Sequence, residues 1–214
     1  MEQIQLDDVI PAVFAQSTGL SSQIWHQQLS LSRGKTYLIE ADSGTGKSSL
    51  CNFIYGSRHD YEGKILFDGH DIRRFPARHW NRIRRDSLGI VFQELALFDE
   101  LTVFENIQLK NRLTGFREIS EIDLWLDRVG IADKRDTRVS HISFGQRQRV
   151  ALLRALCQPL DFLMLDEPVS HLDAGNTRNL FALLLEETAK QHTGLIITSI
   201  GKHPDLTYDQ IIRL

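Results

Sequence analysis

The segment 40–50, which reads E-A-D-S-G-T-G-K-S-S-L, constrains the fold more than any other part of the chain. An apolar run precedes it and a helix-forming run follows it, so the expected order is strand, glycine-containing turn and helix. In this arrangement the backbone N–H groups of the turn and the positive end of the helix dipole surround a phosphate group. Such loops follow the pattern G-x-x-x-x-G-K-[ST], and here Ala41 replaces the first glycine. The segment therefore predicts a phosphate loop, although Gly44 and Gly46 would also suit an ordinary turn beside a surface Lys47.

Polar side chains that follow two of the predicted strands indicate a magnesium–nucleotide site. Lys47 has the length and charge to reach the outer phosphates, and the Ser48 hydroxyl is placed to hold Mg²⁺. Asp166 and Glu167 directly follow the apolar run 162–165, where a carboxylate is costly unless it meets a cation or hydrogen-bond donors. Beside a phosphate loop, Asp166 would orient the Mg²⁺ shell and Glu167 would face the attacking water. Taken alone, the acidic pair would equally suit the start of an exposed loop.

The rest of the chain alternates between strand-like and helix-like patterns. Short apolar runs predict strands at 9–14, 24–31, 63–67, 88–92, 162–165 and 195–198. Capping residues and helical spacing predict helices from Pro76, at 103–113 after Thr102, at 119–129, after Ser143, and from Asp173 to about Gln191. This alternation favours an α/β fold with a mostly parallel, doubly wound sheet that binds its ligand at the carboxyl ends of the strands. We expect one domain, 1–214, with an N-terminal antiparallel β subdomain and a helical subdomain inserted at about 94–157.

Composition narrows the classes of protein that the chain can belong to. A hydrophobic content of 42% and a charged content of 25% are those of an ordinary soluble globule. The formal net charge of −3 gives no general attraction to nucleic acid or anionic lipid, and the arginines after Pro76 are better explained as a solvated face. No apolar window reaches the length of a membrane span, and the first residues lack the pattern of a signal peptide. Cys51 and Cys157 fall in predicted helices and are expected to be buried and reduced, as in a cytosolic protein.

Short motifs follow one another in a characteristic order along the chain. They are A-D-S-G-T-G-K-S-S at 41–49, V-F-Q at 91–93, I-S-F-G-Q-R-Q-R at 142–149, F-L-M-L-D-E-P at 162–168 and S-H-L-D at 170–173. With these motifs the chain resembles, over essentially its whole length, the ATP-binding cassette (ABC) transporter ATPases. Nucleotide kinases and small GTPases share only the phosphate loop. The segment 82–106 is similar to that of small bacterial cassettes for lipoprotein release and macrolide export.

The resemblance implies a P-loop NTPase with ATP and Mg²⁺ as cofactors, and it implies roles for individual residues. The catalytic residues would be Lys47, Gln93, Glu167 and Ser199, and the metal would be held by Ser48, Gln93 and Asp166. The nucleotide would be bound by Phe14 on the adenine, by Ser43, Gly44, Thr45, Gly46, Lys47, Ser48 and Ser49 of the loop, and by Ser143, Gly145 and Gln146 of the signature motif. Asp173 would link the two sites of a dimer. Trp25 is a second ring that could stack on a purine or belong to the core.

The family mechanism implies the partners. Two cassettes close head to tail on two ATP molecules, because each site needs the phosphate loop of one chain and the signature of the other. The resemblance thus implies the ATP-hydrolysing subunit of a transporter, working as a homodimer or heterodimer with integral membrane permease subunits. Its place would be cytoplasmic, peripheral on the inner face of the cell membrane. No nucleic acid partner is expected.

Certain residues depart from the family pattern. Ala41 replaces a loop glycine, and Phe144 replaces a signature glycine with a ring that could hinder approach to the partner's nucleotide. Thr198-Ser199 stands where the family has a histidine after the last catalytic strand; Ser199 can donate a hydrogen bond but cannot become cationic. His203 lies nearby in sequence and is expected to be a surface residue. These departures motivate an alternative function, an ATP-dependent structural or regulatory clamp with weak hydrolysis.

Overall fold

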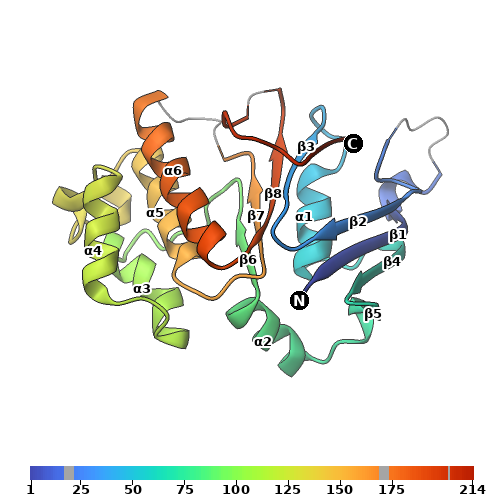
Figure 1. Cartoon of the computed structure of the whole chain (residues 1–214), viewed down its shortest axis with the longest axis horizontal. Helices are drawn as coiled ribbons and strands as arrows, with labels where there is room; N and C mark the ends of the chain where they lie inside the picture. Colours follow the sequence, from blue (N-terminus) through green and yellow to red (C-terminus); the bar gives the residue numbers. More distant parts are fainter. Residues whose placement is uncertain (17–21, 169–173, 202) are drawn as a thin grey trace.

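The computed structural model describes residues 1–16, 22–168, 174–201 and 203–214, without the side chains of 174–177. In this part of the chain the strands form two sheets with helices around them (Figure 1). The antiparallel sheet has the order β2-β1-β4-β5, formed by Gln28–Ser32, Gln3–Pro11, Tyr61–Phe67 and His70–Asp71. The parallel sheet has the order β6-β7-β8-β3-β9, formed by Leu88–Val91, Phe162–Asp166, Gly194–Ser199, Thr36–Glu40 and Gln210–Arg213. The predicted α/β class, with a parallel central sheet and an antiparallel N-terminal unit, is confirmed.

Strands β7 and β8 of the central sheet are mostly apolar, as expected where both faces of a sheet are covered. Every residue of β7 and β8 is buried. Side chains alternate between the faces, so Leu163 and Leu165 join one apolar cluster while Phe162 and Met164 join another. The sheet therefore separates two cores, each belonging to one face.

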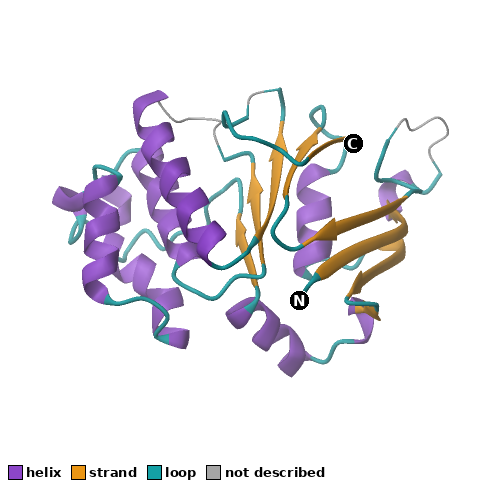
Figure 2. Cartoon of the chain, in the orientation of Figure 1, coloured by secondary structure: helices purple, strands orange, loops and turns teal. Residues whose placement is uncertain are grey.

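The helices divide between these two faces (Figures 1 and 2). Helix α1 (Lys47–Tyr55) lies between the central and the antiparallel sheet and packs in the cluster of Phe162. Helices α5 (Phe144–Leu156) and α6 (Ala174–Lys190) cover the opposite face, with α3 (Val103–Thr114) against α5 and α4 (Ile119–Arg128) against α6. Helix α2 (Ala77–Asp86) follows Pro76 and packs on β6.

Two helices begin at the predicted residues, and their caps explain why. Thr102 accepts a hydrogen bond from the backbone of Glu105, whose carboxylate accepts one from the backbone of Thr102. Ser143 and Gln146 make the same reciprocal pair at the start of α5. Each pair satisfies two N–H groups that the helix cannot satisfy itself.

The N-terminal strands differ from their predicted bounds. The sequence predicts strands at 9–14 and 24–31. Strand β1 instead begins at Gln3 and ends at Pro11, before a short 3-10 turn. Its partner β2 covers only the later part of the second predicted segment. The alternating Q-I-Q-L segment buries Ile4 and Leu6 on one face of the sheet. The strand therefore begins with this alternation, before the denser apolar run that follows it. Strand β9 is likewise missing from the predictions.

The bounds of a helical subdomain at 94–157 stay a prediction. The apolar side chains of α3 and α4 share one continuous cluster with Leu38 and Ile197 of the central sheet. Cys51 and Cys157 are buried free thiols, which confirms the expectation of burial. None of the helices in the described ranges combines the length and apolarity that a membrane crossing requires.

Candidate phosphate-binding site

The loop between β3 and α1 has the backbone geometry of a phosphate cradle. Gly44 and Gly46 both have positive φ, at 82° and 104°. Gly46 caps α1, and its carbonyl accepts the first helical hydrogen bond, from Leu50 N at 2.8 Å. The N-cap residue Gly46 has no side chain with which to cap the helix, so the first N–H groups of α1 face the loop and suit an anion.

Lys47 is a buried cation held against this loop. Its side chain is only 5% exposed, and Nζ donates to the carbonyl of Asp42 at 2.8 Å and to that of Ala41 at 3.3 Å. The Oε1 atom of Glu167 lies 3.7 Å from the same nitrogen. The structure therefore brings together the lysine after β3 and the acidic residue after β7, as the sequence predicts for a single site.

Two aromatic rings, Trp25 and Phe14, lie against the phosphate loop. Trp25 is 3% exposed, and its indole Nε1 donates to the carbonyl of Thr45 at 3.0 Å. A Cβ atom on Gly46 would lie 2.9 Å from Trp25 Cζ2 and 3.3 Å from Phe14 Cε2. Of the two roles considered for Trp25, the structure thus favours the core. Phe14 is half-buried beside the loop, where its stacking role stays a prediction.

The acidic pair is organised by a residue that the sequence predictions missed. Asp166 is buried, and its Oδ1 accepts a hydrogen bond from Thr198 Oγ1 at 2.6 Å. Glu167 follows with a positive φ of 52°, and its backbone N–H points to Thr198 O at 3.2 Å and Oγ1 at 3.3 Å. No local sequence signal identifies this contact, because it depends on the register of β7 and β8, in which Asp166 pairs with Thr198 and the two side chains share a face.

Asp166 lies on the face of the sheet that α1 covers. Burial raises the pKa of the Cys51 thiol, and the negative charge of Asp166 raises that pKa further. Ser48 is three residues before Cys51 and shares its side of the helix. Helix α1, which begins at Lys47, packs against β7, the strand that ends at Asp166.

Gln93 lies in the loop after β6. Its side chain is exposed, and with Asp166 and Glu167 it lines one small cavity whose walls also include Leu152 of α5 and Leu180 of α6. A hydroxyl, an amide oxygen and a carboxylate are the hard oxygen donors that Mg²⁺ prefers. Among the described residues no three His, Cys, Asp or Glu side chains gather as a metal site. A site with one protein carboxylate suits a Mg²⁺ ion that takes its other ligands from phosphates and water.

Ser199 is buried at the end of β8, and its carbonyl accepts a hydrogen bond from Ala41 N at 3.1 Å. Because Thr198 lies on the α1 face, its neighbour Ser199 belongs to the other face. His203 does not replace it: its Nδ1 lies 3.0 Å from the carbonyl of Pro204, and its ring packs edge-on against Tyr208.

The signature residues are not brought to the phosphate loop of the same chain. Ser143 and Gln146 cap α5, and the Gly145 carbonyl accepts from Arg149 Nε at 3.2 Å. Helix α5 packs in the apolar cluster opposite that of α1. Phe144 is 43% exposed at the first turn of α5. The predicted site residues therefore lie in two separate places, the phosphate loop and the start of α5. Asp173, which is predicted to link the two sites of a dimer, lies outside the described residues.

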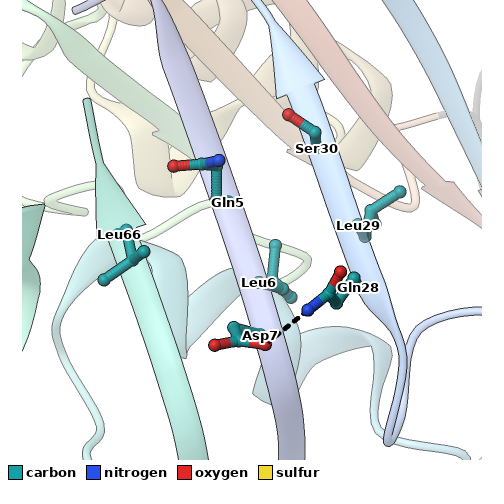
Figure 3. Close-up of a pocket in the computed structure, with 7 residues that line it drawn as sticks. All are labelled: Gln5, Leu6, Asp7, Gln28, Leu29, Ser30 and Leu66. Atoms are coloured by element: carbon teal, nitrogen blue, oxygen red, sulfur yellow. Dashed lines mark hydrogen bonds between the residues drawn. The ribbon is translucent and has the colours of Figure 1, made fainter. Parts of the chain in front are cut away.

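A shallow hollow elsewhere does not fit a phosphate. It lies on the antiparallel sheet and is lined by Gln5, Leu6, Asp7, Gln28, Leu29, Ser30 and Leu66, with Gln28 Nε2 donating to Asp7 Oδ1 at 3.2 Å (Figure 3). These residues belong to β1, β2 and β4, not to the phosphate loop, and none of them is basic. The hollow therefore offers no cation to a phosphate.

Known proteins match the chain over most of its length. A family model described as ABC transporter matches residues 26–170. The phosphonates import ATP-binding protein PhnC of Alcaligenes faecalis is 37% identical over 170 residues, which cover 74% of this chain and 61% of PhnC. The methionine import ATP-binding protein MetN 3 of Pectobacterium atrosepticum is 34% identical over 92% of this chain and 57% of its own length. The chain thus spans about three fifths of these two relatives.

Solved structures share the fold. A dimeric bacterial ABC transporter cassette superposes with a TM-score of 0.77 at 25% identity, covering 92% of this chain and 87% of that one. A bacterial ABC exporter with ATP bound superposes with a TM-score of 0.78 at 25% identity, over 100% of this chain and 37% of the exporter.

Proposed function

The chain belongs to the ABC transporter family, and on that premise we propose that it binds MgATP and hydrolyses it as the ATP-binding subunit of a transporter. The observation that carries the proposal is the buried Lys47, held in a glycine loop with Glu167 Oε1 3.7 Å from its Nζ. A buried cation beside open helix N–H groups suits a polyphosphate, which would replace the loop carbonyls as the partner of Nζ. The import proteins and the ATP-bound exporter among its relatives support the same function.

The residues at the loop would divide the work on the phosphates. Backbone N–H groups of Gly44 to Ser49 would hold the phosphate oxygens, and Lys47 would neutralise the charge that develops on the outer phosphates. A bound Mg²⁺ would supply positive charge that stabilises the negative charge of the phosphates. Its protein ligands would be the hydroxyl of Ser48, the amide oxygen of Gln93 and the carboxylate of Asp166.

Glu167 would orient and polarise the attacking water. It stands at the end of β7 next to Lys47, at the carboxyl edge of the sheet where ligands of doubly wound folds bind. Phosphoryl transfer depends mainly on position and charge, so displacing one of these groups slows the reaction without abolishing binding. Ser199 would contribute at most a hydrogen bond where the family has histidine.

The divided site supports a second cassette as partner. Helix α5 begins on the face opposite the phosphate loop, so Ser143, Gly145 and Gln146 would act on a nucleotide held by another chain. A dimeric cassette is among the solved relatives. We propose a head-to-tail dimer, with the same chain or a different cassette, attached to integral membrane permease subunits at the inner face of the cell membrane.

ATP turnover by the purified protein tests this proposal. The variants are Glu167→Gln, Ser199→His and, as a control, Glu62→Gln, which removes an exposed carboxylate on the antiparallel sheet. For a working ATPase, Glu167→Gln should lower turnover by about 10²- to 10⁴-fold and trap an ATP-bound dimer in light scattering, while the control stays at the wild-type rate. Absence of ATP binding at millimolar concentration by the wild type would refute the proposal.

The alternative function, an ATP-dependent clamp with weak hydrolysis, is favoured by Ser199. In that case the wild type would form a stable ATP-bound dimer without turnover, and Ser199→His would raise hydrolysis. Turnover by the wild type at the rate of the Ser199→His variant would exclude the clamp.

A further inference from the structure

Thr198 forms hydrogen bonds with both acidic residues of the candidate site. It is fully buried on β8, directly paired with Asp166 of β7. Its hydroxyl donates to Asp166 Oδ1 at 2.6 Å, a short hydrogen bond of the charge-assisted type. This hydrogen bond fixes one of the two carboxylate oxygens of the buried Asp166.

The same threonine also meets the backbone of Glu167. The N–H of Glu167 lies 3.3 Å from Thr198 Oγ1 and 3.2 Å from the Thr198 carbonyl. Glu167 has a φ of 52°, a left-handed conformation that L-residues with a side chain rarely adopt. A residue stays in such a conformation only where its surroundings hold it, and Thr198 supplies two acceptors for its N–H.

We propose that Thr198 is a positioning residue: its hydroxyl sets the Asp166 carboxylate for Mg²⁺ and the Glu167 backbone for catalysis. This inference rests on the proposed function. Removing a hydrogen bond to a metal ligand typically costs about 10- to 100-fold in metal affinity or activity. The effect should therefore fall on Mg²⁺-dependent nucleotide binding, and less on binding without the metal.

The test compares two buried threonines near β8. Thr198→Val removes the hydroxyl at nearly constant volume. Thr193→Val is the matched control, because Thr193 is also buried and its Oγ1 donates to the Leu160 carbonyl at 2.8 Å, remote from the acidic pair. The affinity of each protein for ADP, which is not hydrolysed, is measured by calorimetry with Mg²⁺ and with EDTA, together with the midpoint of thermal unfolding.

We expect Thr198→Val to lose about 10- to 100-fold of the Mg²⁺-dependent gain in ADP affinity, while Thr193→Val keeps the wild-type gain at a similar cost in unfolding temperature. Thr198→Ser and Thr198→Ala serve as a second pair, since they leave the same gap and differ only by the hydroxyl; Ser should keep the gain and Ala lose it. If wild type binds ADP with a Mg²⁺-dependent gain that Thr198→Val or Thr198→Ala retains, Thr198 has no positioning role. If wild type binds no nucleotide, the proposed function fails and this inference falls with it.

Discussion

Replacing Gly46 by alanine should destabilise the protein far more than the same change at Gly44. Both glycines have positive φ, 104° and 82°, so an alanine is strained at either position. They differ in the space around them. A Cβ on Gly44 meets nothing within 4 Å, whereas a Cβ on Gly46 lies 2.9 Å from Trp25 Cζ2. The indole cannot retreat easily, because it is buried and hydrogen-bonded to Thr45.

The two situations give different magnitudes. A left-handed conformation costs an L-residue about 1–2 kcal/mol, and this is the full loss of unfolding free energy that we expect for Gly44→Ala. Overpacking against a fixed ring adds about 1–3 kcal/mol, so Gly46→Ala should lose roughly 2–5 kcal/mol of unfolding free energy. If the clash with Trp25 is the cause, Gly46→Ala made in a Trp25→Leu background should return to about 1–2 kcal/mol.

Urea unfolding at 25 °C, followed by circular dichroism, measures these free energies for the single variants and the double variant. The coupling energy of the cycle isolates the ring contact from the backbone strain. Equal losses for Gly44→Ala and Gly46→Ala, or a loss for Gly46→Ala that is unchanged when Trp25 is shortened, would refute the reasoning.

Two further predictions concern groups outside the phosphate loop. The two terminal nitrogens of Arg154 donate to the carbonyls of Leu95 and Ala96, two residues of positive φ. Arg154→Gln should therefore lower the free energy of unfolding by about 1.5–3 kcal/mol and speed amide exchange in this loop. Unchanged exchange in the loop, measured by mass spectrometry, would contradict this prediction. Burial raises the pKa of Cys157 to about 12 and that of Cys51 above its ordinary value of 9.0. Above pH 9 the unfolded chain therefore releases protons that the folded chain keeps, and the free energy of unfolding should fall as the pH rises from 9 toward 12. Urea unfolding at pH 8 and pH 10, with Cys157→Ala as control, measures this loss.

The elements that sequence reasoning located are those with a local physical signature. The phosphate loop, the buried run before Asp166 and the capped start of α5 each depend on residues next to one another in the chain, and each lies where it was expected. Strand β9 was missed because a four-residue Q-I-I-R segment carries too little periodicity, and its position depends on pairing with the distant β3. The start of β1 was misplaced because the prediction followed the dense apolar run at 9–14 and overlooked the alternating Q-I-Q-L pattern before it.

The candidate site likewise combines features that local sequence motifs predict with features that depend on the tertiary structure. Lys47 and Glu167 were expected together from their motifs, and they are 3.7 Å apart at Nζ and Oε1. The hydrogen bonds of Thr198 to the acidic pair and of Trp25 to Thr45 could not be expected, because the first depend on strand register and the second joins segments that are distant in sequence. The opposite placement of the signature follows from which face of the sheet each helix covers, and no local pattern encodes it.

The opposite placement of loop and signature has a genetic consequence. Damage to one half-site leaves the other half-site of the same chain intact, because different faces of the sheet support them. In the proposed head-to-tail dimer, a Lys47→Ala chain paired with a Gly145→Trp chain would form one site from two intact halves and one from two damaged halves. Two such inactive alleles expressed in one cell would therefore complement each other, whereas two alleles damaged in the same half would not.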